Sequence, residues 1–480
     1  MARATLAQGT LGPVGLWIMA VVASSPMTVL VAGIPTMYAA TGVVGTPLAF
    51  VAVGVVLLVL AWPYAAAAGH VRHAAPLYAL LARGRSPVWG VAAGAVALVG
   101  YTAIGTSLYG LVGPRLAELV PVGPWWVFAL VAWLVVAVLG LLGGVSSARL
   151  LGGLLALEIA VIVVYMLTAL ARAEAITFEP LTPTALVVPG MAGVIAFAMA
   201  AFVGVETIPA YAEEARGGRP AVRRAMLAAV AFTAVFYALG AWAMAVHAGP
   251  HEVAKVAADP LTMLGAVFGP GVRVLGTLLL ITSVVAAMTS FHLAATRYVF
   301  AMAREGVLPG RLAVVSTRGD GGTPVAASLT QSGLSGVVIA VTVWGGFDPM
   351  AGMFAWLSTI GAVALLTLLL AAAAGAYGFF AKGLGTNDSV WVRWVAPWTG
   401  GAFGVVLMAT MVSNLGSLLG LPPQSHRWWL VPLFVAATAA VGAMWGLLLR
   451  WRKPHVAAQI GAVVADPVSS PVARLGKLVM

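Results

Sequence analysis

The sequence lacks cysteine altogether and has few charged residues. Of its 480 residues none is cysteine, 8% are charged and only 14 are acidic. The absence of cysteine excludes disulfide bonds, thiolate metal sites and a cysteine nucleophile. Soluble globular chains contain about 25% charged residues, so a chain this poor in charge cannot cover a water-exposed surface. With 62% hydrophobic residues, the composition indicates a polytopic helical membrane protein.

Long apolar runs divide the chain into segments that are long enough to span a membrane. A bilayer core of about 30 Å requires about 20 apolar residues per helix, and by this measure the all-α fold has about 12 transmembrane helices. They are expected at residues 12–40, 43–67, 88–113, 125–143, 149–171, 188–211, 222–247, 271–302, 325–344, 350–378, 396–419 and 428–449.

The distribution of basic residues predicts the topology. If the N-terminus is cytoplasmic, 20 of the 25 lysines and arginines fall on the cytoplasmic side, as the positive-inside rule requires. We therefore expect a multi-pass protein of the cell membrane with cytoplasmic tails at residues 1–11 and 450–480. The net charge of +11 then reflects topology, and no nucleic-acid partner is expected.

Two of the predicted helices contain helix-breaking residues at corresponding positions. Helix 1 is interrupted at Ser24-Ser25-Pro26-Met27-Thr28, and helix 6 at Phe202-Val203-Gly204-Val205-Glu206. Residues 12–171 (helices 1–5) and 188–380 (helices 6–10) would then form two repeats that each open with a broken helix, followed by helices 11 and 12 at 396–449. This pattern is typical of inverted-repeat transporters, which bind substrate at mid-membrane between the breaks. The alternative is a proline kink in helix 1 and a packing glycine in helix 6.

Several stretches resemble the amino acid–polyamine–organocation (APC) permeases. They are Ala198-Met-Ala-Ala-Phe-Val-Gly-Val-Glu206 with Ala212-Glu-Glu-Ala-Arg216, and Arg297-Tyr-Val-Phe-Ala-Met-Ala-Arg-Glu-Gly-Val-Leu-Pro309 with Thr323-Pro-Val-Ala-Ala327. The resemblance covers nearly the whole chain. It implies a LeuT-type fold with a 5+5 inverted repeat, broken helices 1 and 6, alternating access, and transport of amino acids or amines.

The break in helix 1 departs from the pattern of that family. Many members carry a Gly-Ser-Gly type run there, whose backbone amides hold a substrate carboxylate. This chain has Ser24-Ser25-Pro26 instead, and proline has no N–H to donate. The departure favours, as an alternative, a substrate without an α-carboxylate, such as a polyamine.

Candidate substrate-binding residues come from the two breaks and from positions that line the pocket in the resembling fold. Aromatic side chains there can enclose a substrate and contact an ammonium group, although packing or lipid-facing roles explain each one equally well. The candidates are Ser24, Ser25, Pro26, Met27, Thr28, Tyr101, Ala200, Phe202, Val203, Gly204, Phe291, Trp356 and Ser358.

Two acidic residues, Glu158 and Glu206, fall inside predicted spans and away from their ends. Because an ionised carboxylate is costly in hydrocarbon, each must be protonated, paired or exposed to a polar cavity. Both are candidate proton-coupling residues. Glu158 is expected to bind the coupled proton, with a purely structural hydrogen bond as the alternative. Glu206 can stabilise the unwound backbone of helix 6, orient helix 1, or meet a substrate ammonium.

Sodium coupling would require oxygen ligands, including a hydroxyl pair on helix 8. By register with the Arg297 motif, alanines 286 and 287 occupy those positions, and Thr282 and Ser283 lie out of register. The sequence therefore favours protons over sodium. His292 on the same helix can relay protons or pack with a hydrogen bond.

These observations predict a proton-coupled secondary transporter of amino acids or related amines. The alternative is an exchanger or uniporter of polyamines or another substrate without an α-carboxylate. No catalytic motif, metal cluster or phosphate loop is recognisable, so neither an enzyme nor a cofactor nor a bound metal is expected. The expected partners are a small-molecule substrate, protons and the lipid bilayer.

Overall fold

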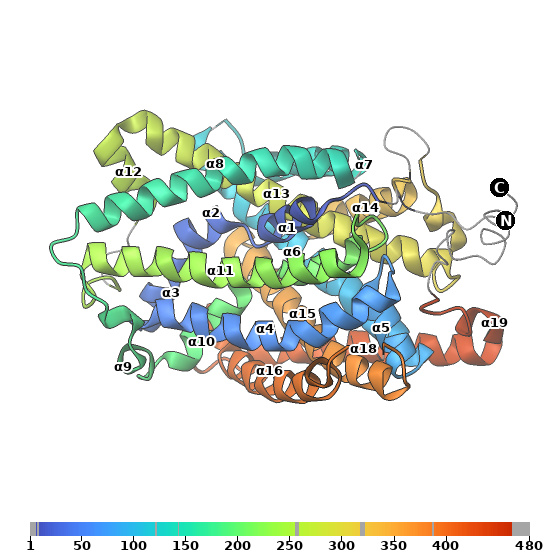
Figure 1. The fold of residues 1–480 in the computed structure, drawn as a ribbon. Coiled ribbons are helices and arrows are strands. Elements are labelled where there is room, and N and C mark those ends of the chain that lie inside the picture. Colours follow the sequence, from blue (N-terminus) through green and yellow to red (C-terminus); the bar gives the residue numbers. More distant parts are fainter. Residues whose placement is uncertain are drawn as a thin grey trace, which may run out of the picture.

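The computed structural model describes residues 6, 9–120, 122–142, 144–254, 259–316, 322–385 and 388–462. Within these residues the chain is built from helices that run roughly parallel along one axis (Figure 1). Most of the two predicted tails, residues 1–5, 7–8 and 463–480, lies outside the described residues.

In the described part, 11 helices are long and apolar enough to cross a membrane, and the shorter apolar helix α7 (Trp125–Leu141) adds a twelfth candidate. Helix 1 is assembled from α1 (Pro13–Ala23), α2 (Pro26–Thr28), a π-helical turn η1 (Val29–Gly33) and α3 (Ile34–Thr41). Helices 2, 3 and 5 are α4 (Thr46–Val71), α6 (Pro87–Leu119) and α8 (Gly144–Ala171). Helix 4 is α7.

The second half begins with helix 6, which consists of α10 (Met191–Ala201) and the 3-10 segment η3 (Val205–Tyr211). Helices 7, 8 and 9 are α11 (Gly218–Ala248), α13 (Pro270–Arg304) and α14 (Val325–Trp344). Helix 10 consists of a π-helical turn η5 (Pro349–Phe354) and α15 (Ala355–Ala381). Helices 11 and 12 contain α16 (Ala396–Ser413) and α18 (Leu430–Arg452).

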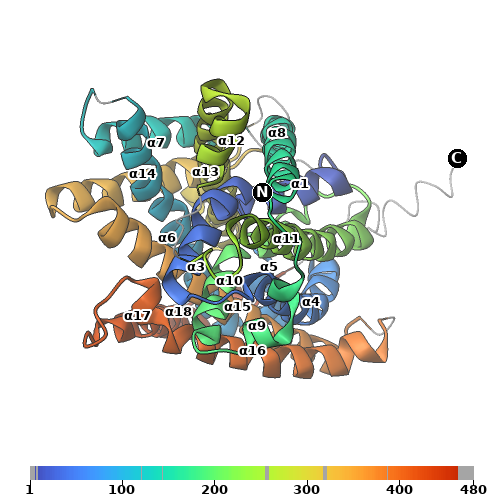
Figure 2. The same ribbon diagram turned by 90° about the vertical axis from the view of Figure 1, so that its left-hand side faces the viewer.

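Short helices mark the two ends of the bundle. The short helices α5 (Pro76–Gly84) and α19 (Pro454–Ala457) lie at one end, which we call the α5 end, and α9 (Pro183–Leu186) and α12 (Pro260–Phe268) lie at the opposite α12 end (Figure 1). Seen from the α12 end, α16 and α18 form one edge of the molecule (Figure 2). Helix α16 packs on α4 and α15, and α18 packs on α6.

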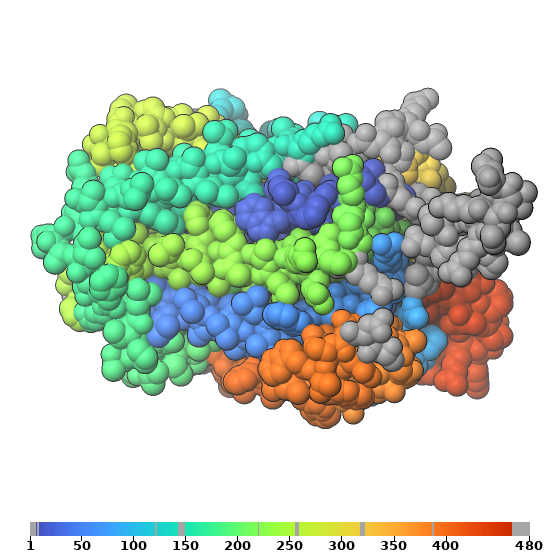
Figure 3. Space-filling model, viewed as in Figure 1, coloured from blue at the N-terminus to red at the C-terminus, as the bar shows by residue number. Residues whose placement is uncertain are grey.

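Helix 1 occupies the centre of the bundle. The segment α1 contacts α8, α11, α13 and η3, and on the molecular surface it appears between α8 and α11 (Figure 3). Most of its residues from Leu16 to Ala23 are buried. Large apolar side chains stay exposed on the outer helices, for example Leu134 on α7, Val405 on α16 and Leu447 on α18. Such an apolar exterior suits a bilayer rather than water.

The structure confirms the predicted all-α class and the interrupted helices 1 and 6. It differs in the length of helix 3, which was expected to end near residue 113 and continues to Leu119. The extra turn carries Arg115 and Glu118, which form an exposed ion pair at 3.0 Å; a hydrophobicity criterion omits such charged helix ends. The π-helical turns of helices 1 and 10 were not predicted. The division into repeats at 12–171 and 188–380, with helices 11 and 12 at 396–449, stays a prediction.

Candidate functional site at the two helix breaks

Helix 1 breaks at Ser25. Its backbone has a left-handed conformation (φ +48°), and the next residue, Pro26, opens α2. Because proline has no N–H, it cannot continue the hydrogen bonding of α1. The freed backbone is satisfied locally and from α11: the hydroxyl of Tyr237 donates to the Ser24 carbonyl oxygen at 2.9 Å, and the Ser24 hydroxyl donates to the carbonyl oxygen of Val21 at 2.8 Å.

Helix 6 breaks at Gly204, whose φ of +117° is accessible to glycine and strained for other residues. The carboxylate of Glu206 accepts a hydrogen bond from the Gly204 N–H at 2.8 Å. The hydroxyl of Thr207 donates to the Gly204 carbonyl oxygen at 2.7 Å. Glu206 therefore stabilises the unwound backbone through Oε2, while its Oε1 is buried without a hydrogen-bond partner.

The two breaks touch each other. A Cβ atom added at Gly204 would lie 2.7 Å from the Cβ of Ala23 and 2.8 Å from its carbonyl carbon. Real Cβ atoms do not approach other atoms so closely, so the backbones of α1 and η3 meet here without room for a side chain. The predicted meeting of two interrupted helices inside the bundle is thus present in the structure.

Replacement of Gly204 with alanine should lower the stability of the folded protein. The methyl group would collide with Ala23, and alanine would be strained at this φ; overpacking of this kind costs about 1–3 kcal/mol. Gly333→Ala on α14 is the matched control, because a Cβ there meets nothing within 4 Å. The measurement is the melting temperature of the purified proteins. Equal melting temperatures for Gly204→Ala and the control would contradict the prediction.

Glu158 on α8 is connected to the helix 1 break through hydroxyl groups. It is 2% exposed, and its Oε2 accepts a hydrogen bond from the Ser283 hydroxyl of α13 at 2.6 Å. The Oγ of Ser283 lies 3.0 Å from that of Ser25, and the Oγ of Ser25 lies 2.7 Å from the Oγ1 of Thr28. The backbone amide of Met27 also faces the Glu158 carboxyl group. One carboxylate thus holds together helices 1, 5 and 8.

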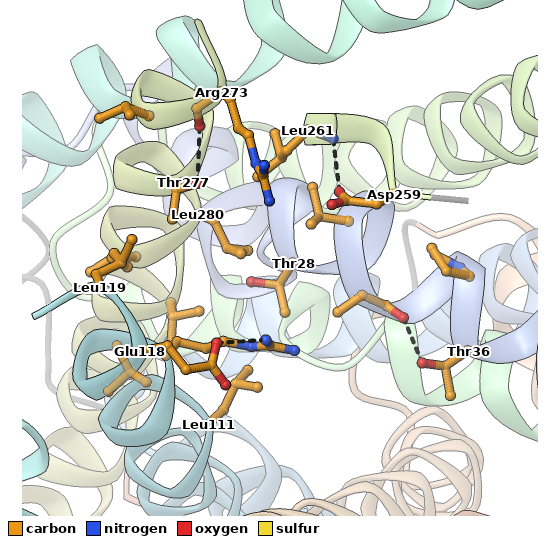
Figure 4. A pocket seen from close by; sticks show the side chains of 18 of the residues that line it. Thr28, Thr36, Leu111, Glu118, Leu119, Asp259, Leu261, Arg273, Thr277 and Leu280 are labelled. Carbon is orange, nitrogen blue, oxygen red and sulfur yellow. Dashed lines mark hydrogen bonds and ion pairs between the residues drawn. The ribbon is translucent and has the colours of Figure 1, made fainter. Parts of the chain in front are cut away.

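A pocket of about 790 Å³ reaches the break from the α12 end. It lies between helix 1, the last turns of α6, the residues around α12 and the first turns of α13. Figure 4 shows Thr28 between Asp259 and Arg273 on one side and Glu118 on the other. Of the predicted substrate-binding residues, Thr28 lines this pocket.

The remaining predicted pocket residues are distributed around the breaks. Tyr101 on α6 stacks on Phe291 of α13 with ring centroids 6.5 Å apart, and Phe202 packs against Phe50 and Tyr237. Those five rings are buried.

Other predicted members have more ordinary surroundings. Ala200 on α10 is half-buried, and Val203 is buried in the helix 6 break. Trp356 and Ser358 on α15 are half-buried, and the Ser358 hydroxyl donates to its own helix at the Ala355 carbonyl oxygen, 3.3 Å away. Among the described residues, no hydrogen bond or ring contact joins Trp356 or Ser358 to the helix 1 break.

The α5 end is closed beneath the breaks by a buried ion pair. Arg297 of α13 donates to Oε1 of Glu214, just after η3, through Nε at 2.7 Å and lies at 2.6 Å through its second nitrogen. Both side chains are at most 5% exposed, and the guanidinium lies 4.0 Å from the centre of the Tyr211 ring. The Glu214 carbonyl oxygen accepts the N–H of Leu11 at 3.0 Å. The ends of helices 1 and 6 are therefore joined to helix 8.

A second buried ion pair, between Glu213 and Arg304, lies next to that of Glu214 and Arg297. Glu213 accepts two hydrogen bonds from Arg304 at 2.7 and 3.0 Å and one from the Ala74 N–H at 2.9 Å. The α5 end is thus closed by two adjacent acid–base pairs, each of which joins the end of helix 6 to helix 8.

Glu305 forms a third contact of the closed end. Its Oε1 lies 2.7 Å from Nε2 of His73, and its Oε2 accepts from the Tyr78 hydroxyl at 2.6 Å and from the Gly461 N–H at 2.9 Å. Gly461 follows α19, so the end of the described chain is bound to the closed α5 end.

The ion pair of Glu213 should make stability depend on pH. Burial opposes ionisation of Glu213, but the hydrogen bonds and charge of Arg304 hold the pKa of this carboxyl group below its ordinary value of 4.5. A carboxyl group whose pKa is lower in the folded than in the unfolded state stabilises the fold at pH values above its unfolded-state pKa. This stabilisation is lost as the pH falls through its folded-state pKa. We expect Glu213→Gln to have a lower melting temperature than the unaltered protein at neutral pH. This difference in melting temperature should shrink as the pH falls below the ordinary carboxyl pKa of 4.5. Melting curves from about pH 7 to about pH 3.5 test this, and a gap that is the same at every pH would contradict it.

Sequence reasoning missed three contributors to the site. Tyr237 is a hydroxyl residue on an otherwise apolar helix, and nothing in its sequence context marks it. Ser283 was noticed as a hydroxyl on helix 8 but was not assigned to the site. Sequence reasoning placed Ser283 out of register, yet its hydroxyl lies 3.0 Å from that of Ser25 and donates to Glu158. The assignment of alanines 286 and 287 to the positions of a sodium-binding hydroxyl pair stays a prediction. Glu214 lies in the quoted helix 6 motif, but its pairing with Arg297 was not predicted.

Comparison with known proteins identifies the family. A family model described as amino acid permease matches residues 14–441. The chain belongs to this family. None of the curated proteins compared with the permease matches it. Among solved structures, the permease is similar to the manganese transporter of Eremococcus coleocola in complex with an aromatic bis-isothiourea substituted compound. The TM-score is 0.58 at 14% identity, covering 92% of the permease and 95% of that chain. This likeness shows the fold, and with the family it confirms the predicted APC-type transporter architecture.

Proposed function

We propose that this permease is a proton-coupled secondary transporter of amino acids or related amines that works by alternating access. The observation that carries the proposal is the position of Glu158. It is buried at the helix 1 break, and among the described residues it forms no ion pair with a lysine or arginine. A proton is the simplest species that can neutralise this carboxylate, because an unpaired charge in the membrane interior is costly.

Alternating access requires a site that opens to one side at a time. In this structure the pocket reaches Thr28 from the α12 end, while the pair of Arg297 and Glu214 closes the α5 end. In the predicted orientation, with both termini cytoplasmic in the cell membrane, the α12 end faces outward. The structure then corresponds to an outward-facing state, and helices 1, 2, 6 and 7 would move against helices 3, 4, 8 and 9 to reach the opposite one.

Protonation of Glu158 can couple to this movement because its hydrogen bonds cross between the two groups of helices. Ser283 belongs to helix 8, whereas Ser25 and Thr28 belong to helix 1. An ionised Glu158 accepts from Ser283, whereas a protonated one can donate to it. The charge of Glu158 thus alters the hydrogen bonds at the boundary between helix 1 and helix 8, along which the two groups of helices move. A proton can shift the population between two conformations only if it interacts differently with each, and these hydrogen bonds supply that difference.

A substrate ammonium group has an acceptor available in the helix 6 break. Glu206 Oε1 is buried without a partner, as are the hydroxyls of Tyr64 and Tyr211. Tyr64, Tyr101 and Tyr298 lie close enough to the Glu206 carboxyl group to interact with it electrostatically. Tyrosine faces and a carboxylate are groups that favour an ammonium ion.

One observation favours the narrower alternative, an amine without an α-carboxylate. A carboxylate in this fold requires free N–H groups at the helix 1 break. Pro26 has none, and the next amide, that of Met27, already faces Glu158. A polyamine or another decarboxylated amine avoids this competition, and such a permease could also act as an exchanger or uniporter.

Transport by the purified protein in liposomes tests these proposals. Labelled amino acids should be compared with the amines formed by their decarboxylation, with and without an imposed pH gradient. Accumulation that requires an acidic outer compartment supports proton coupling, and accumulation that ignores the gradient contradicts it. Faster transport of the amine than of the matching amino acid supports a substrate without an α-carboxylate. Faster transport of the amino acid contradicts that alternative.

A further inference from the structure

We propose that the hydroxyls of Thr28, Ser25 and Ser283 form a relay that carries protons between the α12-end pocket and Glu158. This inference rests on the proposed function, in which Glu158 binds the coupled proton. Glu158 is 2% exposed and is not among the residues that line the pocket, whereas Thr28 lines it. A proton that enters through the pocket therefore needs a path from Thr28 to Glu158.

The three hydroxyls supply a continuous path. The oxygen atoms of Thr28 and Ser25 are 2.7 Å apart, those of Ser25 and Ser283 are 3.0 Å apart, and Ser283 Oγ lies 2.6 Å from Glu158 Oε2. All three distances fall within the range of O–H···O hydrogen bonds. The relay passes from helix 1 to helix 8 and then to helix 5 without an intervening gap.

The direction of the hydrogen bonds follows from counting protons. Each hydroxyl has one proton to donate, and an ionised Glu158 can only accept. Ser283 must therefore donate to Glu158, Ser25 to Ser283, and Thr28 to Ser25. When a hydronium ion in the pocket gives a proton to Thr28 Oγ1 and is left as water, each hydroxyl passes its own proton on to the next oxygen. Glu158 gains the final O–H bond, and every hydroxyl again holds one proton.

The backbone break is what places Ser25 in this path. Its left-handed conformation (φ +48°) ends α1, and its hydroxyl lies between Thr28 and Ser283. The neighbouring Ser24 is excluded, because its hydroxyl donates to Val21 and accepts from Tyr237 at 3.1 Å.

The surroundings of Glu158 offer few competing groups. From helix 7 the titratable neighbour is Tyr237, whose hydroxyl donates to Ser24. Helix 8 presents Ser283, and helix 1 presents the Met27 amide and the Ser25 side chain. None of these groups is a charged base, so the hydroxyl relay is the route that the contacts of Glu158 provide toward the pocket.

Two substitutions interrupt the relay at different points, Thr28→Val and Ser283→Ala. Valine keeps the shape of threonine and removes its hydroxyl. Thr28→Ser restores a hydroxyl at the first position. Thr282→Val is the matched control on helix 8, because the Thr282 hydroxyl donates to its own helix at Leu279.

The measurement is proton-driven uptake in liposomes, divided by the rate of substrate counterflow in the same variant. Counterflow requires a folded carrier but no net proton movement, so the ratio isolates proton delivery. Loss of a positioned proton-transfer group lowers rates by about 100-fold or more, and partial replacement by water reduces that loss. We expect the ratio to fall about tenfold or more in Thr28→Val and Ser283→Ala, to recover in Thr28→Ser, and to stay unchanged in Thr282→Val.

The outcomes separate the relay from the proposed function. A ratio that stays within about twofold of the unaltered permease in both Thr28→Val and Ser283→Ala overturns the relay. If Glu158→Gln also keeps pH-driven uptake, proton coupling through Glu158 fails with it. If Glu158→Gln loses that uptake while both relay variants keep it, the relay alone is wrong.

Discussion

Replacement of Glu158 with glutamine should abolish accumulation of substrate against a gradient while counterflow continues. Glutamine has nearly the shape of glutamate and can still accept from Ser283, so the hydrogen bond that joins helices 5 and 8 at 2.6 Å can persist. It cannot bind or release a proton at physiological pH. Because the proposed coupling depends on this one carboxylate, the expected loss of pH-driven accumulation is complete rather than partial.

The experiment compares liposomes with an acidic outer compartment and liposomes without a gradient. Glu174→Gln is the matched control, because Glu174 is exposed in the loop after helix 5. Wild-type accumulation ratios in Glu158→Gln would remove Glu158 from the coupling mechanism. Loss of counterflow together with accumulation would show instead that Glu158 is required for folding or for the transport cycle itself.

Replacement of Arg297 with alanine should open the α5 end. Arg297 is held by Glu214 and by the Tyr211 ring, and its removal leaves a buried carboxylate without a counter-ion. Breaking a buried pair in this way costs about 3–5 kcal/mol. This destabilises the closed conformation and not the open one, because opening lets water reach Glu214. The balance between the two states should therefore shift strongly toward the inward-facing one. Arg297→Lys should restore it only in part, because lysine cannot reproduce the planar contact of a guanidinium.

The lack of cysteine makes this shift measurable. The chain has no cysteine, so a cysteine introduced at the buried position Ala212 is the single thiol for labelling. A water-soluble maleimide applied to the purified permease should react far faster when Arg297→Ala is added. Arg115→Ala is the control, because its pair with Glu118 is 51% and 64% exposed and exposed pairs contribute about 0–1 kcal/mol. Equal labelling rates in the Arg297 and Arg115 variants would show that the ion pair does not hold the α5 end closed.

The sequence predicts those parts of the site that depend on the local chain. Pro26 and Gly204 interrupt their helices for reasons contained in the residues themselves, a missing N–H and a missing Cβ. Glu158 and Glu206 are conspicuous because acidic residues are rare inside spans. For Glu206 the structure shows that one carboxylate oxygen accepts the Gly204 N–H, whereas a role toward a substrate ammonium stays a proposal.

The contacts between helices could not be predicted in the same way. Ser283 and Ala286 lie on the same face of α13, one turn apart, and three residues correspond to about 4.5 Å along a helix. An error of one turn in aligning helix 8 with helix 1 therefore exchanges a hydroxyl for a methyl group at the break. Tyr237 was missed for a related reason: its partner, the Ser24 carbonyl oxygen, is exposed only because another helix is broken.

The hydrogen bond from the Gly461 N–H to Glu305 connects the segment after α19 to the end of helix 8. Glu305 also holds His73 and Tyr78, so motion of helix 8 away from α5 must strain or release the backbone bond to Gly461. A fluorophore or fusion partner attached just beyond this point would then report each turnover as a change in its own freedom. Conversely, a bulky attachment at that position could slow the cycle without touching the substrate.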